Sequence, residues 1–251
     1  MLSGRLSYEE VLQAKVSESL EFMKSRASKL LENGDFLQMP QESIEEALSS
    51  ITPANHTSWW KGRWRGSTRW HSFLYVVTRI LRPNVVVETG VLYGNSSAAI
   101  LAALEDNRSG GLVSVDLPLE EHRSITVGGR SIQDGIVSDE LSVGCAIPLN
   151  LHSRWSLQLG NSLDLLPNIL SKVGPISIFV HDSLHTYDHM MSEFRLGYHA
   201  LEHGGLLVSD DVDYNSAWLD FCNSKNLKWS NLSKVKDSSG QFAFALKSNS
   251  T

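Results

Sequence analysis

Residues 85–97 read Val85-Val86-Val87-Glu88-Thr89-Gly90-Val91-Leu92-Tyr93-Gly94-Asn95-Ser96-Ser97. The valines predict a buried strand, the glycines a tight turn, and the apolar residues from Ser96 to Leu104 a helix. This unit holds nucleotide-like ligands in α/β folds, although an ordinary strand–turn–helix is the alternative. The spacing is Gly-x-x-x-Gly and no Gly-Lys-Ser/Thr follows, so neither a plain dinucleotide fingerprint nor a phosphate-binding loop is met.

Further strands and helices alternate along the chain. Strands are predicted at 112–116, 155–159, 176–180 and 206–209, and helices at 162–170, 193–201 (closed by Gly204-Gly205) and 217–222. Segments 227–232 and 241–246 are typical of an antiparallel hairpin. The alternation predicts an α/β fold with a mainly parallel sheet that is covered on both faces.

Acidic residues follow several of these strands. They are Glu88, Asp116, Asp182, Asp210 and Asp211. Because ligands bind at the carboxyl ends of parallel strands, we expect these acids to converge on one cleft. Asp116 lies close to the usual distance after Glu88 for a ribose-binding acid, with a turn or helix-capping role as the alternative.

Three of these acids suggest a metal site. Asp182, Asp210 and Asp211 would repel one another, and a divalent cation such as Mg²⁺, Mn²⁺ or Ca²⁺ would relieve the repulsion. Alternatively, one residue of the pair 210–211 faces away and caps a helix. His185, three residues after Asp182, is suited to take a proton from a metal-bound hydroxyl, or else caps the following helix. His181 is expected to be buried.

The chain before residue 83 has no strand–helix repeat. Ser7 and Glu10 form a predicted capping box before an amphipathic helix over 8–31. A second short helix runs from Pro40 to Leu48. We therefore expect a helical extension or lid over 1–82 and a ligand-binding domain over 83–251, and the exposed amphipathic helices are compatible with a homodimer.

Two stretches have open interpretations. Trp59-Trp60-Lys61-Gly62-Arg63-Trp64-Arg65-Gly66 interleaves aromatic residues with cations. It is a loop whose tryptophans pack on the core, a lid over an anionic or ring-bearing substrate, or a nucleic-acid contact. The long, glycine-rich connection over 117–150 is expected to flank the ligand mouth. Asn161 and Ser162 either contact an adenine edge or cap the helix that follows.

Bulk properties narrow the function. The 251 residues carry a net charge of −6, which disfavours a general nucleic-acid binder. The sequence has no apolar run that would span a membrane and no signal-peptide pattern at its start. The two cysteines, Cys145 and Cys222, have no metal or redox spacing. We therefore expect a cytoplasmic protein without a membrane partner.

As a set, the motifs resemble class I S-adenosylmethionine (SAM)-dependent methyltransferases. More closely, they resemble metal-dependent O-methyltransferases of the macrolide-sugar and aminocoumarin-sugar type. The likeness rests on Glu88-Thr89-Gly90-x-x-x-Gly94, on Asp116, and on His181-Asp182-Ser183-Leu184-His185-Thr186-Tyr187 followed by Gly204-Gly205-x-x-x-Ser209-Asp210-Asp211, within residues 83–246. It implies a Rossmann-like, seven-stranded, mostly parallel sheet with a C-terminal antiparallel hairpin.

The resemblance also implies site residues. Glu88 and the Gly90–Gly94 turn would hold the methionine part of the cofactor, and Asp116 would hold the ribose hydroxyls. The full implied sets are Glu88, Gly90, Tyr93, Gly94, Asn95, Ser96, Asp116, Asn161, Ser162 and Asp182 for the cofactor, Asp182, Asp210 and Asp211 for the metal, and His185 with Asp182 for catalysis. The chain departs from the family at Leu92, where many members have glycine, and at His-Asp-Ser-x-His, where relatives often have Asp-Gly-x-His.

The expected function is SAM-dependent methyl transfer to a hydroxyl of a small molecule, such as a natural product or a sugar, assisted by Mg²⁺ or another divalent cation. Two alternatives remain open. The first is a metal-independent methyltransferase acting on a nitrogen, a carboxyl or another oxygen acceptor. The second is a non-catalytic nucleotide-binding protein.

Overall fold

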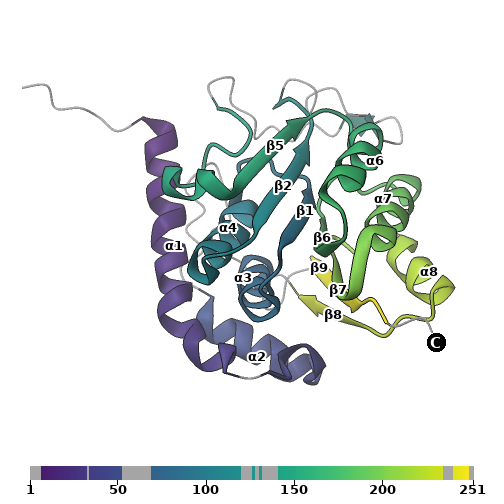
Figure 1. Ribbon diagram of the computed structural model, residues 1–251, viewed down its shortest axis with the longest axis horizontal. Helices are drawn as coiled ribbons and strands as arrows, with labels where there is room; N and C mark the ends of the chain where they lie inside the picture. Colours follow the sequence, from purple (N-terminus) through teal and green to yellow (C-terminus); the bar gives the residue numbers. More distant parts are fainter. Residues whose placement is uncertain are drawn as a thin grey trace, which may run out of the picture.

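A seven-stranded sheet crosses the molecule (Figure 1). The structure, a computed structural model, describes residues 7–32, 34–52, 69–119, 126–127, 130–131, 141–233 and 240–248. The strands are β1 (Val85–Thr89), β2 (Gly111–Asp116), β5 (Trp155–Leu159), β6 (Ile176–His181), β7 (Leu201–Ser209), β8 (Trp229–Ser233) and β9 (Gln241–Leu246). Their order is β5-β2-β1-β6-β7-β9-β8, with β9 antiparallel to both neighbours and the other pairs parallel. The predicted sheet and its C-terminal hairpin are confirmed.

The helices separate these strands along the chain. They are α1 (Tyr8–Leu31), α2 (Gln41–Ile51), α3 (Arg69–Leu81), α4 (Asn95–Asn107), α6 (Ser162–Val173), α7 (Tyr187–Ala200) and α8 (Ala217–Ser224), with 3₁₀ turns η1 (Phe36–Gln38) and η2 (Leu149–Arg154). A separate two-stranded ladder joins β3 (Thr126–Val127) to β4 (Arg130–Ser131), which the sequence did not predict. Among the helices in these ranges, none combines the length and apolar character needed to cross a bilayer.

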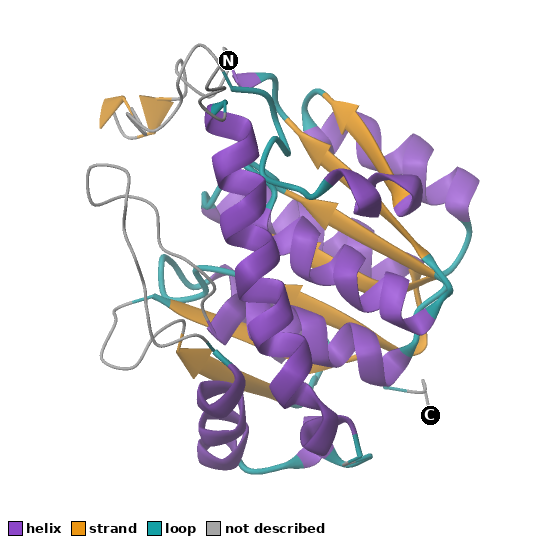
Figure 2. Cartoon of the chain, turned by 90° about the vertical axis from the view of Figure 1, so that its left-hand side faces the viewer, coloured by secondary structure: helices purple, strands orange, loops and turns teal. Residues whose placement is uncertain are grey.

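The two faces of the sheet carry separate cores because strand side chains alternate in direction. Val86 and Val180 face the layer of α1–α4, whereas Val87 and Phe179 face α6–α8. Figures 1 and 2 show these helices on the two sides of the sheet. The central strands are therefore buried on both faces, as their nearly continuous apolar sequences predict.

The first helix lies on the outside of its layer (Figure 2). Ser7 and Glu10 form the predicted capping box at its start. Its apolar stripe is buried in the core that includes β1, and consists of Leu12, Val16, Leu20, Met23 and Ala27. The chain itself thus covers the apolar face of α1 that suggested a homodimer. The homodimer stays a prediction, as does the boundary between a helical extension over 1–82 and a ligand-binding domain over 83–251.

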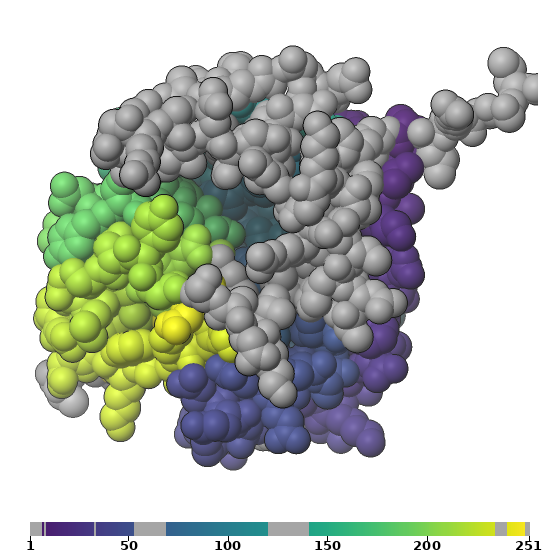
Figure 3. Space-filling view, turned by 180° about the vertical axis from the view of Figure 1, so that it is seen from behind, coloured from purple at the N-terminus to yellow at the C-terminus, as the bar shows by residue number. Residues whose placement is uncertain are grey.

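The N-terminal helices also contact the last strands of the chain. On α3, the ring of Phe73 lies 5.3 Å from that of Phe242 and 5.1 Å from that of Phe244, both on β9. Glu45 of α2 accepts a hydrogen bond from the backbone nitrogen of Ser233 on β8. Figure 3 shows α2, in blue, bordering the yellow C-terminal strands.

The bounds predicted for the helix over 193–201 are wrong, and the prediction for the tryptophan-rich stretch cannot be compared with the structure. Helix α7 begins at Tyr187, six residues before its predicted start, and ends at Ala200. Gly204 and Gly205 do not close it but lie within β7, because the chain passes from helix to strand without a loop. Gly204 has φ +76° in an irregular part of the β6–β7 ladder, a conformation that glycine tolerates. The stretch Trp59–Arg65 lies outside the described residues.

Candidate functional site

Four neighbouring strands end together at one edge of the sheet. Thr89 pairs with Val115 on β2 and with His181 on β6. His181 in turn pairs with Ser209 on β7. The predicted acids therefore lie at or next to this edge, as the sequence indicated.

The glycine turn lies between β1 and α4. Gly90 and Gly94 have φ of +83° and +89°, and Gly94 caps α4. A Cβ atom on Gly90 would lie 1.9 Å from the carbonyl oxygen of Asp182, so only glycine fits there. Leu92 stands where many family members have glycine, and it adopts φ +49°. This left-handed conformation is one that glycine accepts more readily than leucine does.

Asp116 fixes the same turn from the end of β2. Its Oδ2 accepts hydrogen bonds from the backbone nitrogens of Val91 (2.9 Å) and Leu92 (2.7 Å). Its Oδ1 accepts from the backbone nitrogen of Leu117 at 2.8 Å. The ribose-binding role of Asp116 stays a prediction, and the structure adds a turn-stabilising role.

Glu88 is fully buried beneath the turn. Ser97 and Ser114 donate to its Oε2 through their hydroxyls at 2.6 and 2.9 Å. Burial raises the pKa of the Glu88 carboxyl from 4.5 to about 7, although these hydroxyls oppose the shift. Within the described residues, Oε1 has no hydrogen-bond partner. Contact of Glu88 with the cofactor stays a prediction.

The end of the 117–150 connection, within the described residues 141–150, packs against the turn, whereas residues 120–125, 128–129 and 132–140 lie outside the described residues. The backbone nitrogen of Gly144 donates to the carbonyl of Leu92, and that of Ala146 to the carbonyl of Tyr93, at 2.8 and 2.9 Å. Tyr93 is buried. Asn95 and Ser96 open α4 directly after the turn. The sequence placed 117–150 near the ligand mouth but gave no sign of this backbone pairing.

Asn161 and Ser162 have separate roles. Asn161 Oδ1 accepts from the backbone nitrogen of Leu163 at 2.9 Å, which confirms the capping alternative. Ser162 instead donates its hydroxyl to Glu193 and also contacts His189. An adenine contact of either residue stays a prediction.

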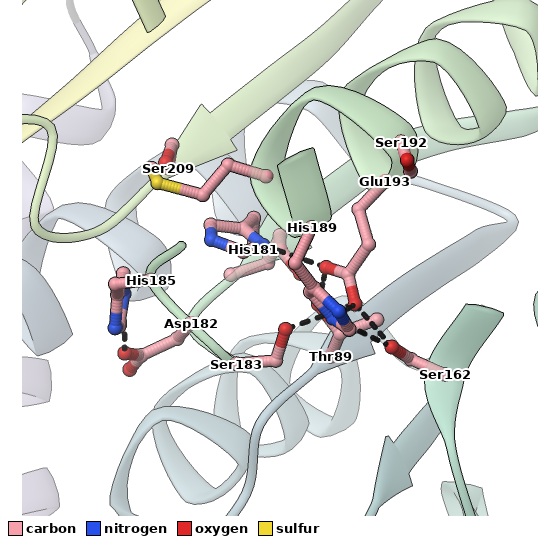
Figure 4. Close-up of polar contacts among 12 residues, drawn as sticks. Thr89, Ser162, His181, Asp182, Ser183, His185, His189, Ser192, Glu193 and Ser209 are labelled. Atoms are coloured by element: carbon pink, nitrogen blue, oxygen red, sulfur yellow. Dashed lines mark hydrogen bonds and ion pairs between the residues drawn. The ribbon is translucent and has the colours of Figure 1, made fainter. Parts of the chain in front are cut away.

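His185 lies between two acids in the described part of the site. Its Nε2 is 3.9 Å from Asp182 Oδ1, and its Nδ1 is 3.8 Å from Asp211 Oδ2. These distances exceed those of hydrogen bonds, and an ion pair with either carboxylate forms only when the imidazole is protonated. Asn215 fixes the backbone by donating from Nδ2 to the His185 carbonyl at 3.2 Å. Figure 4 shows the imidazole above Asp182.

The predicted metal ligands are not gathered into one centre. The imidazole of His185 separates Asp182 from Asp211, and Asp210 is buried with its backbone bonded to the His181 carbonyl. Across the described ranges, no group of three or more His, Cys, Asp or Glu side chains is placed to hold a metal ion. The oxygen donors are chemically suited to Mg²⁺, but this arrangement does not fit it.

A buried cluster around Glu193 lies beside His185, and the sequence reading missed it (Figure 4). Five side chains donate to this carboxylate, which is 0% exposed: Thr89, Ser162, His181, Ser183 and His189. Burial alone would raise the pKa of the Glu193 carboxyl. The charges of and hydrogen bonds from His181 and His189 outweigh burial and hold that pKa well below its usual range. The one feature of the sequence that could have indicated this cluster is the position of Glu193 next to Phe194 on an apolar face of the helix.

Comparisons with known proteins agree with this fold. A family model described as a methyltransferase domain matches residues 87–212, half of the chain. No curated protein matches. The O-methyltransferase TomG from Streptomyces achromogenes, involved in tomaymycin synthesis and solved with SAM, is 13% identical, with a TM-score of 0.56 over 99% of this chain and 93% of that chain. An O-methyltransferase from Bacillus cereus, solved with SAH, is 17% identical, with a TM-score of 0.52 over 90% of this chain and 100% of that chain.

Both structures share the fold of this chain, and the alignment with TomG covers 99% of it, so that alignment takes in the N-terminal helices. The Rossmann-like methyltransferase fold predicted from the sequence is confirmed. Because the family model spans half of the residues, the resemblance to SAM-dependent methyltransferases is confirmed as well, and the chain belongs to the methyltransferase-domain family.

Proposed function

We propose that the protein transfers a methyl group from SAM to a hydroxyl group of a small molecule and that His185 takes the hydroxyl proton. The observation that carries the proposal is the imidazole held between Asp182 and Asp211 at the carboxyl edge of the sheet. Two O-methyltransferases of the same fold hold SAM or SAH, which supports this cofactor and an oxygen acceptor. The net charge of −6 favours a small-molecule acceptor over nucleic acid.

The residues at the turn fit the cofactor. The backbone of Gly90–Gly94 leads directly into α4, whose first amides carry partial positive charge. Asp116 supplies a carboxylate at the end of the neighbouring strand. Tyr93, Asn95 and Ser96 complete the proposed cofactor contacts at this turn. When bound, SAM supplies an electrophilic methyl group, so the protein mainly orients the acceptor and removes its proton.

His185 is suited to proton removal. Its side chain is 18% exposed and its Nε2 atom is buried, so in this proposal Nδ1 takes the hydroxyl proton. After it takes the proton, the imidazolium is stabilised by the carboxylates of Asp182 and Asp211. Asp182 thus acts as an electrostatic partner of the base. No proton step in this scheme requires a further group.

Assistance by a divalent cation stays a prediction. The set Asp182, Asp210 and Asp211 has the hard oxygen donors that Mg²⁺ prefers, but His185 separates two of its members. This separation favours methyl transfer without a metal ion, as in the metal-independent alternative that acts on a nitrogen, a carboxyl or another oxygen acceptor. Activity in EDTA equal to that in Mg²⁺ would support a metal-independent reaction, whereas loss in EDTA and recovery with Mg²⁺ would support cation assistance. A cytoplasmic location also stays a prediction.

Calorimetry with SAH tests the cofactor, and a hydroxylated acceptor panel tests the reaction. We expect wild-type protein to bind SAH, and its failure to do so would refute the proposal. With an acceptor in hand, His185→Ala should keep SAH binding and lower kcat by roughly 100- to 10,000-fold. His199→Ala, at an exposed histidine of α7, is the matched control and should keep kcat. An unchanged kcat in His185→Ala would remove His185 as the base.

A further inference from the structure

The fully buried carboxylate of Glu193 connects several elements at the edge of the sheet. Its Oε2 accepts from Thr89 Oγ1 at 2.5 Å and from His181 Nδ1 at 2.6 Å. Its Oε1 accepts from Ser183 Oγ and His189 Nε2, both at 2.9 Å, and from Ser162 Oγ. An ionised carboxylate only accepts hydrogen bonds, so both imidazoles must donate to it.

The donors come from the segments that form the site. Thr89 directly precedes the glycine turn, and Ser162 begins α6. His181 and Ser183 flank Asp182, whose carbonyl oxygen faces Gly90 without room for a side chain. The carboxylate therefore ties together the ends of β1 and β6 and the start of α6 from beneath.

Stability alone does not explain this cluster. A buried charge loses its hydration, and a packed apolar side chain of similar size is often at least as stabilising. Charge-assisted hydrogen bonds, however, are strongly directional and fix the relative positions of their partners. The ring of His181 also lies edge-on to that of His185, with centroids 5.3 Å apart. The cluster thus reaches the proposed base through a neighbouring ring.

We infer that Glu193 is a positioning residue: from beneath the site it sets the glycine turn relative to the Asp182–His185 segment, without touching cofactor or acceptor. This inference rests on the proposed function. The five donors enclose the carboxylate, so its effect on the reaction is transmitted through them. It follows that Glu193 should control both the affinity for SAH and the rate of transfer at saturating substrate.

The main test compares Glu193→Gln with Glu193→Asp. Glutamine keeps the size but has one acceptor oxygen for five donors, whereas aspartate keeps the charge on a shorter side chain. For Glu193→Gln we expect SAH affinity about tenfold weaker, equivalent to about one charge-assisted hydrogen bond. We also expect kcat, counted per SAH-binding site from the calorimetric stoichiometry, to fall by roughly tenfold or more. Glu193→Asp should recover part of both losses.

A merely structural role gives a different result. In that case Glu193→Gln would reduce the fraction of folded protein, but the remaining sites would keep wild-type SAH affinity and kcat. That result would overturn the inference. Failure of wild-type protein to bind SAH would instead refute the proposed function, so the two failures are distinguishable.

A milder pair of variants covers the case in which Glu193→Gln does not fold. Ser183→Ala removes one donor and leaves the carboxylate with four, so we expect about a threefold loss of SAH affinity and of kcat per site. Ser192→Ala is the matched control, because its hydroxyl donates to the Asp188 carbonyl, away from the cluster. Equal behaviour of the two serine variants would overturn the inference. If Glu193→Gln folds, adding Ser183→Ala to it should cause little further loss.

Discussion

The substitution Glu88→Gln should change how the stability of the ligand-free protein depends on pH. Glu88 is fully buried, and burial raises the pKa of its carboxyl from 4.5 to about 7. The folded state therefore binds this proton more tightly than the unfolded state. The associated stability is fully present below pH 4.5 and is lost as pH rises through about 7. Glutamine does not titrate, yet its carbonyl can accept from Ser97 and Ser114 as the carboxyl does.

The magnitude follows from the two pKa values. At about 1.36 kcal/mol for each pH unit, the interval between 4.5 and about 7 corresponds to about 3 kcal/mol of unfolding free energy. Most of this falls between about pH 5 and about pH 8, where the variant should gain about 2 to 3 kcal/mol relative to wild type.

Urea unfolding of both proteins across this range, followed by circular dichroism, measures the effect. The difference between variant and wild type is the relevant quantity, because other titrating groups then cancel. Glu18→Gln, at a side chain that is 79% exposed, is the control, and its difference in unfolding free energy from wild type should not grow in this way as pH rises. Parallel stability curves for Glu88→Gln and wild type would refute the reasoning.

Three further predictions follow from local geometry. Gly90→Ala should lower the free energy of unfolding by more than about 3 kcal/mol or prevent folding, because it combines a positive φ with a clash against a carbonyl oxygen. Gly204→Ala has a similar φ but open space around the new methyl group, so it should lower that free energy by only about 1 to 2 kcal/mol. Equal losses in urea unfolding would contradict this. Asp116→Ala should weaken SAH binding by about tenfold or more, because three backbone amides lose their acceptor; unchanged calorimetric affinity would be evidence against it. Burial raises the pKa of the Cys145 and Cys222 thiols to about 12, so a thiol reagent should label neither in native protein and both in denaturant.

The strands were predictable because their cause is local. The valines of 85–87 and the apolar run of 176–180 identify buried strands without reference to the rest of the chain. An acid that follows such a strand must then lie at the carboxyl edge. The approach of His185 to Asp182 was predictable for the same reason, since the two lie in one short segment.

The Glu193 cluster was not predictable because its contacts are long-range. Thr89 and Glu193 are separated by 104 residues, and Ser162 and Glu193 by 31. In the sequence, the position of Glu193 beside Phe194 on an apolar helix face is the one local sign of burial, and only tertiary packing shows which side chains surround its carboxylate. The pairing of Gly144 with the turn was hidden for the same reason. The direction of single side chains, such as the imidazole between Asp182 and Asp211, likewise depends on packing.

The contact between α3 and β9 has a consequence for how the protein folds during its synthesis on the ribosome. Phe73 is synthesised well before its partners Phe242 and Phe244, which lie about 170 residues later in the sequence. Until β8 and β9 have been synthesised, α3 therefore lacks the strand that covers Phe73. Such a distant pairing slows folding and leaves apolar surface open to aggregation until β9 has been synthesised. A chain cut short before β8 would keep every residue proposed for chemistry and still lack the strands that complete its sheet.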